Sequence, residues 1–357
     1  MKKSKRISRL LIALALATSM LLGGCTESES SSSKTSNSTA ETTAISITTT
    51  APPATTEPTV TTSSTPVDPQ NHRDITPMMW EVKSQGGAKI YMLGSMHALN
   101  EEVYPLPDEI LNAYNESDSL AVECDVISFQ ANFEAQMQMM NDMKYPTGKT
   151  IKDDIGEDLY NKLVALLKSK SMYMSMYDGY KPVFWMSLIE NQLAIDAKLN
   201  STKGFDMYIL DKAHKDGKNV IEVETAQFQT EMLASFSLEL YKLQLEVYVN
   251  DYDAQVASMT DLYEAWCNGT VDKVILEESV DETQYTAEQK AALEDYNKKM
   301  LTDRNVGMKN KLVEMLKNNQ KVFYVVGAAH FVGEGGIIDL LEKDGYTVTA
   351  VTYASQN

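Results

Sequence analysis

Two histidines of this chain end the same short motif, Gly-x-x-His. Gly94 and His97 belong to the first copy, and Gly327 and His330 belong to the second. Composition alone predicts about 0.2 such pairings from 17 glycines and four histidines in 357 residues. A neutral imidazole is the commonest metal ligand and the commonest general base near neutral pH. The repetition therefore predicts that His97 and His330 serve one site, as ligands of a metal ion.

Each motif follows a short apolar segment that is typical of a buried strand, residues 89–93 and 321–326. Each then leads through a loop and a helical stretch to another apolar strand, residues 119–122 and 346–351. The chain thus contains a βαβ-like unit twice. Parallel strands with helical crossovers place their carboxyl ends at one edge of a sheet, and ligands of open α/β sheets bind there. Both histidines are expected at that edge, where a glycine permits a sharp turn or a close approach.

Glu123 ends the strand that follows the first motif. The apolar residues 120–122 would bury its carboxylate, and a buried carboxylate without a partner is costly. A metal, a histidine or an arginine should therefore face it. As a third metal ligand, Glu123 would complete a His₂Glu set that leaves a position open for water; as a general base, it would take that water's proton. The sequence leaves both roles open, together with the alternative that His97 and His330 are structural.

Apolar residues at helical spacing predict the remaining elements. Helices are expected over 129–143, 153–169, 182–199 and 204–215, then a strand over 219–223, then helices over 226–249 and 287–317. The predicted fold class is α/β, with a central sheet built from the two Gly-x-x-His units and a large helical insertion at about 128–218.

Several segments, in this order along the chain, resemble the TraB/GumN (TraB/PrgY/GumN) family, which includes the Tiki metalloproteases. They are the two Gly-x-x-His motifs, Glu123, Gly204-Phe205-Asp206, the run from Val223 to Gln227, and Arg304-Asn305. The resemblance covers residues 76–353. It implies a metal-dependent peptidase whose fold is related to the erythromycin esterase and ChaN-like group. Imidazole and carboxylate ligands suit Zn²⁺, Mn²⁺ or Co²⁺, and the resemblance favours Mn²⁺ or Co²⁺.

The same resemblance brings four further residues to the site. Asp206 would orient a histidine through its second ring nitrogen, with a cap at a helix start as the alternative. Glu224, at the end of a strand, is the second such candidate for a role in the site. Arg304 and Asn305 would clamp a substrate carboxylate or a developing oxyanion.

The N-terminus has the pattern of a bacterial lipoprotein signal. Basic residues precede an apolar run over 10–22, and Leu22-Gly23-Gly24-Cys25 resembles a lipobox. The run is shorter than the roughly 20 residues that a membrane-spanning helix needs. Cleavage would leave Cys25 as a diacylated N-terminus on the extracytoplasmic face of the cell membrane. The alternative is an ordinary secretory signal in which this cysteine occurs by chance.

Residues 26–72 consist almost wholly of Ser, Thr, Pro, Ala and Glu. Without an apolar pattern that could build a core, this segment is expected to be a disordered tether to a folded domain over 73–357. Loss of residues 1–24 removes five positive charges and no acid, so the net charge changes from −18 to about −23. That charge argues against nucleic acid as a partner, because phosphates would be repelled.

Two cysteines and two histidines remain outside these assignments. Cys124 and Cys267 are expected to be buried free thiols rather than a disulfide. His72 and His214 are expected in solvent and without a catalytic role.

The predicted function is therefore a lipid-anchored extracytoplasmic metallohydrolase that acts on a peptide or protein through His97, Glu123 and His330. The chain has no His-Glu-x-x-His, Gly-x-Ser-x-Gly or P-loop motif, which argues against the common zinc protease, serine hydrolase and nucleotide-enzyme classes. The alternative is a non-catalytic surface receptor that sequesters a peptide. Metal content distinguishes the two.

Overall fold

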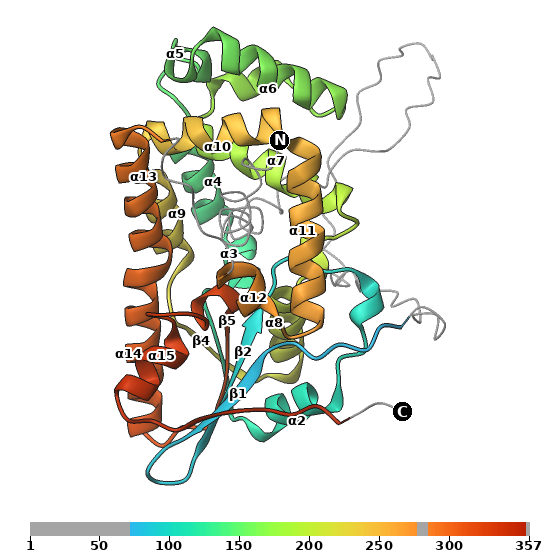
Figure 1. The fold of residues 1–357 in the computed structure, drawn as a ribbon, viewed down its shortest axis with the longest axis vertical. Coiled ribbons are helices and arrows are strands. Elements are labelled where there is room, and N and C mark those ends of the chain that lie inside the picture. The colour runs from blue at the N-terminus through green and yellow to red at the C-terminus, as the bar shows by residue number, and fades with distance from the viewer. Residues whose placement is uncertain (1–71, 277–284, 355–357) are drawn as a thin grey trace, which may run out of the picture.

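The computed structural model describes residues 72–276 and 285–354 (Figure 1). The predicted signal peptide, Cys25 and the tether up to residue 71 lie outside the described residues. One sheet has the strand order β4-β3-β5-β2-β1-β6. Its strands are β1 (Met79–Lys83), β2 (Lys89–Ser95), β3 (Ser119–Val122), β4 (Asn219–Glu222), β5 (Val322–Gly327) and β6 (Val348–Ala350). The expected α/β class is confirmed, whereas the grouping with erythromycin esterase and ChaN stays a prediction.

Both predicted βαβ units are present. β2, α2 (Asp108–Glu116) and β3 form the first, and β5, α15 (Ile337–Lys343) and β6 form the second. The strands of each unit run in the same direction, but they are not neighbours. β5 lies between β2 and β3, while β2 and β1 lie between β5 and β6. This interleaving sets β5 parallel to β2, with Gly94 opposite Val326 and Ser95 opposite Gly327, so the two motifs lie side by side.

β1 runs antiparallel to both β2 and β6, and the sequence pattern did not predict it. Among its five residues, Met79 and Val82 are the buried ones. These two buried residues are three positions apart, whereas a half-buried strand buries every second residue. The strand therefore lacks the alternating pattern by which a strand is predicted from sequence. The pairing of β1 with β2 and β6 therefore defines this strand.

Helices fill the two long connections of the sheet. Between β3 and β4 lie α3 (Val126–Ala131), α4 (Phe133–Asp142), α5 (Ile151–Ile155), α6 (Glu157–Ser169), α7 (Pro182–Asp196) and α8 (Phe205–Asp216). Between β4 and β5 lie α9 (Ala226–Ala234), α10 (Leu238–Asn250), α11 (Tyr252–Cys267), α12 (Val271–Leu276), α13 (Ala287–Asn297) and α14 (Asp303–Lys317). Helices α5, α6, α7 and α10 gather beyond the carboxyl ends of the parallel strands (Figure 1).

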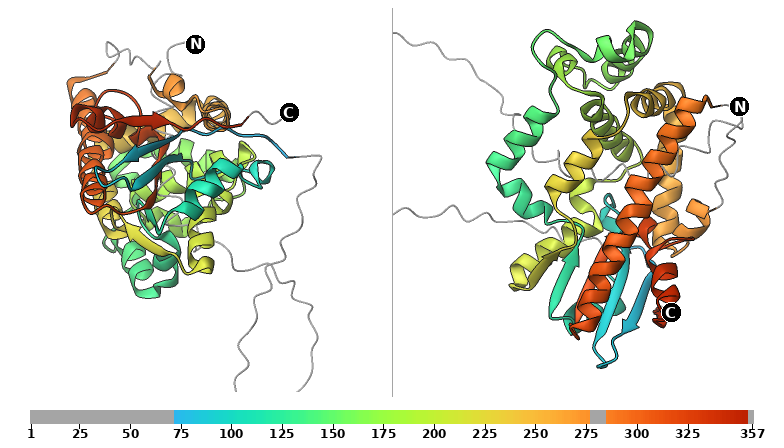
Figure 2. Two further views of the ribbon diagram at one scale, coloured as in Figure 1. Left: turned by 90° about the horizontal axis from the view of Figure 1, so that it is seen from below. Right: turned by 90° about the vertical axis from the view of Figure 1, so that its left-hand side faces the viewer.

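The predicted helical boundaries needed several corrections. The helices expected over 129–143 and 153–169 are each divided, because Asn132 ends α3 and caps α4 and because Gly156, with a positive φ of 83°, separates α5 from α6. The helix expected over 226–249 is two helices, because Ser237 caps the start of α10 by accepting a hydrogen bond from the amide of Leu240 at 3.2 Å. The stretch over 287–317 contains a π-helical turn, Lys298–Thr302, yet α13 and α14 form one long rod that runs down along the sheet (Figure 2). Helices α11 and α12 were not predicted.

Side chains on the two faces of the sheet belong to two apolar clusters. One face, with Leu93, Val122 and Val325, packs against the helices of the two long connections. The other face, with Met92, Ala121 and Val326, packs against α14 and α15. Burial on both faces explains why the parallel strands are nearly continuous apolar runs. Within the described ranges, no helix has the length and apolar character needed to cross a membrane.

One buried carboxyl group lies in the helical layer. Tyr248 donates a hydrogen bond to Glu190 Oε1 at 2.8 Å. Oε2 of Glu190 has no hydrogen-bond partner among the residues that the structure describes. Burial raises the pKa of Glu190 well above its usual range, so the folded protein keeps this carboxyl protonated where the unfolded chain ionises it.

Glu190→Gln is therefore expected to change how stability depends on pH. The wild type loses stability as pH rises above the ordinary pKa of a glutamate, because the unfolded state releases the proton first. The neutral amide of the variant avoids this loss. Thermal melts should show a variant whose Tm exceeds that of the wild type by an amount that grows with pH and vanishes in acid. A difference that is independent of pH would contradict the assignment.

Candidate active site at the carboxyl edge of the sheet

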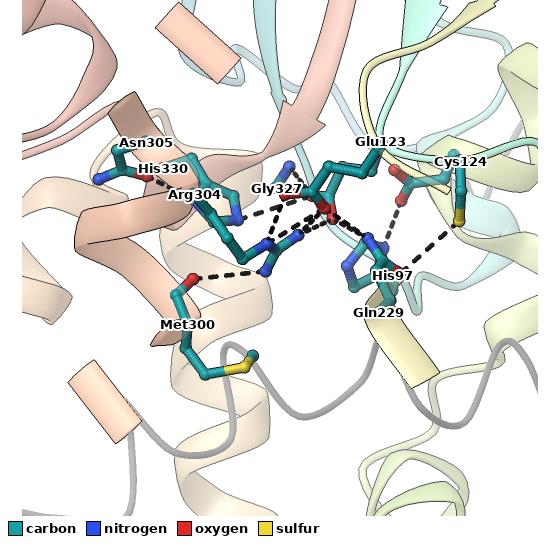
Figure 3. Close-up of polar contacts among 11 residues, drawn as sticks. His97, Glu123, Cys124, Gln229, Met300, Arg304, Asn305, Gly327 and His330 are labelled. Carbon is teal, nitrogen blue, oxygen red and sulfur yellow. Dashed lines mark hydrogen bonds and ion pairs between the residues drawn. The ribbon is translucent and has the colours of Figure 1, made fainter. Parts of the chain in front are cut away.

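The predicted site residues follow four neighbouring parallel strands where these end. His97 follows β2, Glu123 follows β3, Glu224 follows β4, and His330 lies in a 3₁₀ turn directly after β5. Gly327 is the last residue of β5. Because these strands share a direction, their carboxyl ends meet at one edge and bring the side chains together (Figure 3).

Two glycines permit the backbone approaches that assemble this edge. A Cβ added to Gly94 would lie 2.8 Å from Cα of Ala328, so Gly94 lets β2 pack against the turn that carries His330. A Cβ added to Gly204 would lie 2.2 Å from the carbonyl oxygen of His97. Gly204 therefore lets the start of α8 contact the backbone of the first motif.

Each motif histidine has its Nδ1 atom next to a side-chain oxygen. His97 Nδ1 lies 2.8 Å from Asp206 Oδ2, and His330 Nδ1 lies 2.6 Å from Asn305 Oδ1. The amide of Asn305 donates to the carbonyl of Gly335 at 3.0 Å, which fixes its orientation. With Nδ1–H donated to these oxygens, Nε2 of a neutral ring carries a free lone pair, as in a metal-ligating histidine. Asp206, the second residue of α8, thus orients His97 instead of capping the helix.

The two rings differ in protonation. Burial opposes protonation of His97, but the adjacent Asp206 outweighs it and raises the pKa of His97 to about 9. Burial and the positive charge of Arg304 lower the pKa of His330 to about 3. His330 is therefore neutral at pH 7, whereas a metal ion at His97 would compete with a proton.

Glu123 is buried, and N–H donors contact both of its oxygens. Oε1 accepts from the amide of Gly327 at 2.7 Å, and Oε2 accepts from Arg304 Nη2 at 2.6 Å and from Gln229 Nε2 at 2.9 Å. Oε1 also lies 3.8 Å from His330 Nε2. Burial opposes ionisation, but the positive charge of Arg304 and the backbone hydrogen bond from Gly327 outweigh it and hold the pKa of Glu123 well below its usual range. Glu123 is therefore a firmly held anion.

Arg304 is enclosed by protein acceptors. Its Nε donates to both carboxylate oxygens of Glu224, at 2.9 and 3.1 Å, and its Nη2 donates to Glu224 at 2.8 Å as well as to Glu123. Its Nη1 donates to the carbonyl of Met300 at 3.3 Å. Only 4% of Arg304 is exposed. The expected clamp on a substrate is thus corrected, because the guanidinium instead bridges Glu123 and Glu224 of the protein itself.

The helix turn before Arg304 has an unusual form. Residues Lys298–Thr302 make a π-helical turn, and its Met300 carbonyl accepts the hydrogen bond from Arg304. Such single π turns are frequent at functional sites. The turn joins α13 to α14 and so sets where Arg304 and Asn305 begin α14.

The charges of the site, which are buried or nearly so, do not balance. Glu123, Glu224 and Asp206 supply three carboxylates, and Arg304 supplies one guanidinium. Even with His97 protonated, the cluster carries one net negative charge. A buried excess of negative charge favours the binding of a cation.

The site has two side chains suited to bind a divalent cation, but not a complete set of ligands. The free Nε2 atoms of His97 and His330 are suitable donors, and Glu123 lies beside His330. Within residues 72–276 and 285–354, however, no group of three or more His, Cys, Asp or Glu side chains is arranged to hold a metal ion. The expected His₂Glu set is thus present as two oriented imidazoles and one carboxylate that is engaged with Arg304.

The sequence did not single out two buried residues of this region. The side-chain amide nitrogen Nε2 of Gln229, on α9, donates hydrogen bonds to Glu123 at 2.9 Å and to Glu224 at 3.0 Å. Gln229 thus bridges the two carboxylates. Ser95 lines a small cavity together with His97, and its hydroxyl has no hydrogen-bond partner in the described part of the chain. Gln229 lies two residues beyond the family-like segment that ends at Gln227, which is the one sequence signal that could have drawn attention to it.

The remaining expectations concern residues outside the site. Cys124 and Cys267 are buried free thiols, as expected. His72 and His214 are exposed, and His214 Nε2 forms an ion pair with Asp125 Oδ2 at 2.9 Å.

Comparison with known proteins gives a family match over most of the chain. The TraB/PrgY/gumN family model matches residues 78–350. Metalloprotease TIKI2 of Xenopus tropicalis is 23% identical over 337 residues, which are 80% of this chain and 63% of that protein. Metalloprotease TIKI1 of Homo sapiens is 20% identical over 80% of this chain and 64% of that protein. The chain therefore spans less than two thirds of the length of these relatives.

A bacterial relative is matched over most of its own length. YbaP, an uncharacterized protein of Escherichia coli (strain K12), is 21% identical over 264 residues, which are 73% of this chain and 90% of YbaP. No solved structure matches the chain significantly.

Proposed function

We propose that this chain, which belongs to the TraB/PrgY/gumN family, is a metal-dependent hydrolase that cleaves peptides or proteins. One observation carries the proposal: two imidazoles, each oriented through Nδ1, share a sheet edge with more carboxylates than cations, and His330 is buried while only 12% of the His97 side chain is exposed. The relatives named metalloproteases support the choice of reaction.

His97 and His330 would hold the ion through their Nε2 atoms, with Glu123 as the neighbouring negative charge. When bound, a divalent cation acidifies a water molecule and polarises a carbonyl group. Mn²⁺ or Co²⁺ is the proposed ion, with Zn²⁺ as the alternative. Asp206 and Asn305 keep the two rings in the ligating orientation.

The other polar residues keep Glu123 ionised and fixed. The amide of Gly327, the guanidinium of Arg304 and the side-chain amide of Gln229 all donate to its carboxylate. Such donors stabilise the charged form of a carboxyl group. Glu224 satisfies the remaining face of the guanidinium, so that Arg304 stays buried without an unpaired charge.

The proposed location is the extracytoplasmic face of a bacterial cell membrane, with a lipid on Cys25. The lipobox-like Leu22-Gly23-Gly24-Cys25 and the Ser/Thr/Pro-rich segment after it support this proposal. A tether of this composition would let the folded domain reach substrates away from the membrane surface.

Metal removal tests the function directly. The purified protein is expected to contain about one divalent ion per chain, to cleave members of a peptide library, and to lose cleavage after chelation. Adding back Mn²⁺, Co²⁺ or Zn²⁺ separately should restore it with at least one ion. Peptide binding without metal, and without any effect of chelator, would favour the receptor alternative.

A further inference from the structure

A groove of about 650 Å³ opens between α9 and α14, next to the candidate active site. Glu224 and Arg304 form part of its wall, and these two residues connect the groove to Glu123 on their other side. Its volume lies within the range of about 300–1,000 Å³ that is typical of ligand pockets. The groove is therefore continuous with the polar network that holds the catalytic carboxylate.

The groove has an apolar lining. Val223, Phe228, Met232 and Met308 contribute hydrocarbon or sulfur surface. Phe228 is 45% exposed, although a large aromatic ring gains most when it is covered. Methionine side chains adapt their shape to varied apolar partners. An apolar group entering the groove would cover Phe228 and contact Met232.

A glycine in the wall keeps part of this space open. Gly307 lies inside α14, where glycine destabilises a helix by about 0.5–1 kcal/mol relative to alanine. A Cβ added at Gly307 would meet no atom within 4 Å, and its backbone is not in the left-handed region. Neither packing nor backbone conformation requires glycine here. What the missing side chain provides is free space on the groove side of α14.

We infer that this groove binds a large apolar side chain of the peptide substrate, and that Gly307 keeps the groove open for it. The inference rests on the proposed peptidase function, because Glu224 and Arg304 connect the groove to Glu123. It names the specificity that the function leaves open, namely a bulky apolar residue close to the bond that is cleaved.

Filling the groove from Gly307 tests the inference. Gly307→Phe places a ring in the free space, and Gly307→Ala is the matched control because it also removes the glycine but adds one methyl group. Two cleavable peptides that differ at one position, leucine or alanine, serve as substrates. Gly307→Phe should lower kcat/KM for the leucine peptide about tenfold or more, mainly through KM, and leave the alanine peptide unchanged. Gly307→Ala should retain the selectivity of the wild type.

Thermal melts accompany the kinetics, because both substitutions replace a helical glycine and should leave Tm unchanged or raise it. If Gly307→Phe does not fold, Gly307→Leu fills the same space with a smaller side chain. Equal effects on the two peptides, or no effect on either, would overturn the inference.

Binding of 1-anilinonaphthalene-8-sulfonate separates this inference from the proposed function. The naphthalene rings suit the apolar lining, and Lys299 and Lys311 in the wall suit the sulfonate. Fluorescence enhancement should occur with the wild type and Gly307→Ala and fall with Gly307→Phe. If Gly307→Phe loses dye binding but none of the three proteins cleaves a peptide, the peptidase proposal is refuted and the groove remains an apolar binding site. Metal-dependent cleavage whose selectivity is the same in all three forms would refute the groove and keep the peptidase.

Discussion

His97→Ala and His330→Ala are each expected to lower both bound metal and peptide hydrolysis by more than about 100-fold. Changing a residue that merely orients a metal ligand already costs about 10- to 100-fold, so loss of the ligand itself should cost more. Both Nε2 atoms are the free nitrogens of rings whose Nδ1 atoms are held, by Asp206 and by Asn305. Metal analysis of the purified variants and kcat/KM with a cleaved peptide measure the two effects.

His214→Ala is the control for this prediction. His214 is exposed, and its partner Asp125 is a buried carboxylate that also accepts hydrogen bonds from the amide and the hydroxyl of Ser128, so Asp125 keeps partners in the variant. The variant should therefore retain metal and activity. Melting curves for all three variants distinguish loss of the site from loss of the fold, because His330 is buried. Full hydrolysis by both motif variants would mean that the two histidines do not form the site.

Glu123→Gln is expected to lower metal occupancy and, with it, hydrolysis by at least about 100-fold. The substitution keeps the shape of the side chain but removes the negative charge beside His330. Both oxygens of Glu123 already accept hydrogen bonds from N–H donors, which suits a fixed charge better than a group that exchanges protons. Inductively coupled plasma analysis and peptide kinetics on the same preparation measure both quantities.

Glu224→Gln is the matched control, because it removes the other carboxylate that Arg304 bridges. In each variant the guanidinium keeps one anionic partner, so the losses of stability should be similar. The loss of metal should be larger for Glu123→Gln, because Glu123 is the carboxylate that lies beside His330. Retained metal with activity reduced by about 10²- to 10⁴-fold would instead identify Glu123 as a general base.

Local sequence patterns were sufficient to locate every strand of the sheet except β1, and the residues that end the parallel strands. Apolar segments bounded by glycine predicted β2 and β5, and the carboxyl-edge rule then predicted that His97, Glu123 and His330 lie close together. These inferences depend on the period of side chains along a strand and on the common direction of parallel strands. Both are properties of short segments, which a sequence displays directly.

Only the tertiary structure decided which side chains are partners. Asp206 contacts His97 across 109 positions of the chain, and Arg304 contacts Glu123 across 181. Such pairs depend on how α8 and α14 pack on the sheet, which periodicity within one element does not encode. For the same reason the sequence suggested a clamp on substrate at Arg304, whereas the position of α14 turns that side chain inward to bridge Glu123 and Glu224.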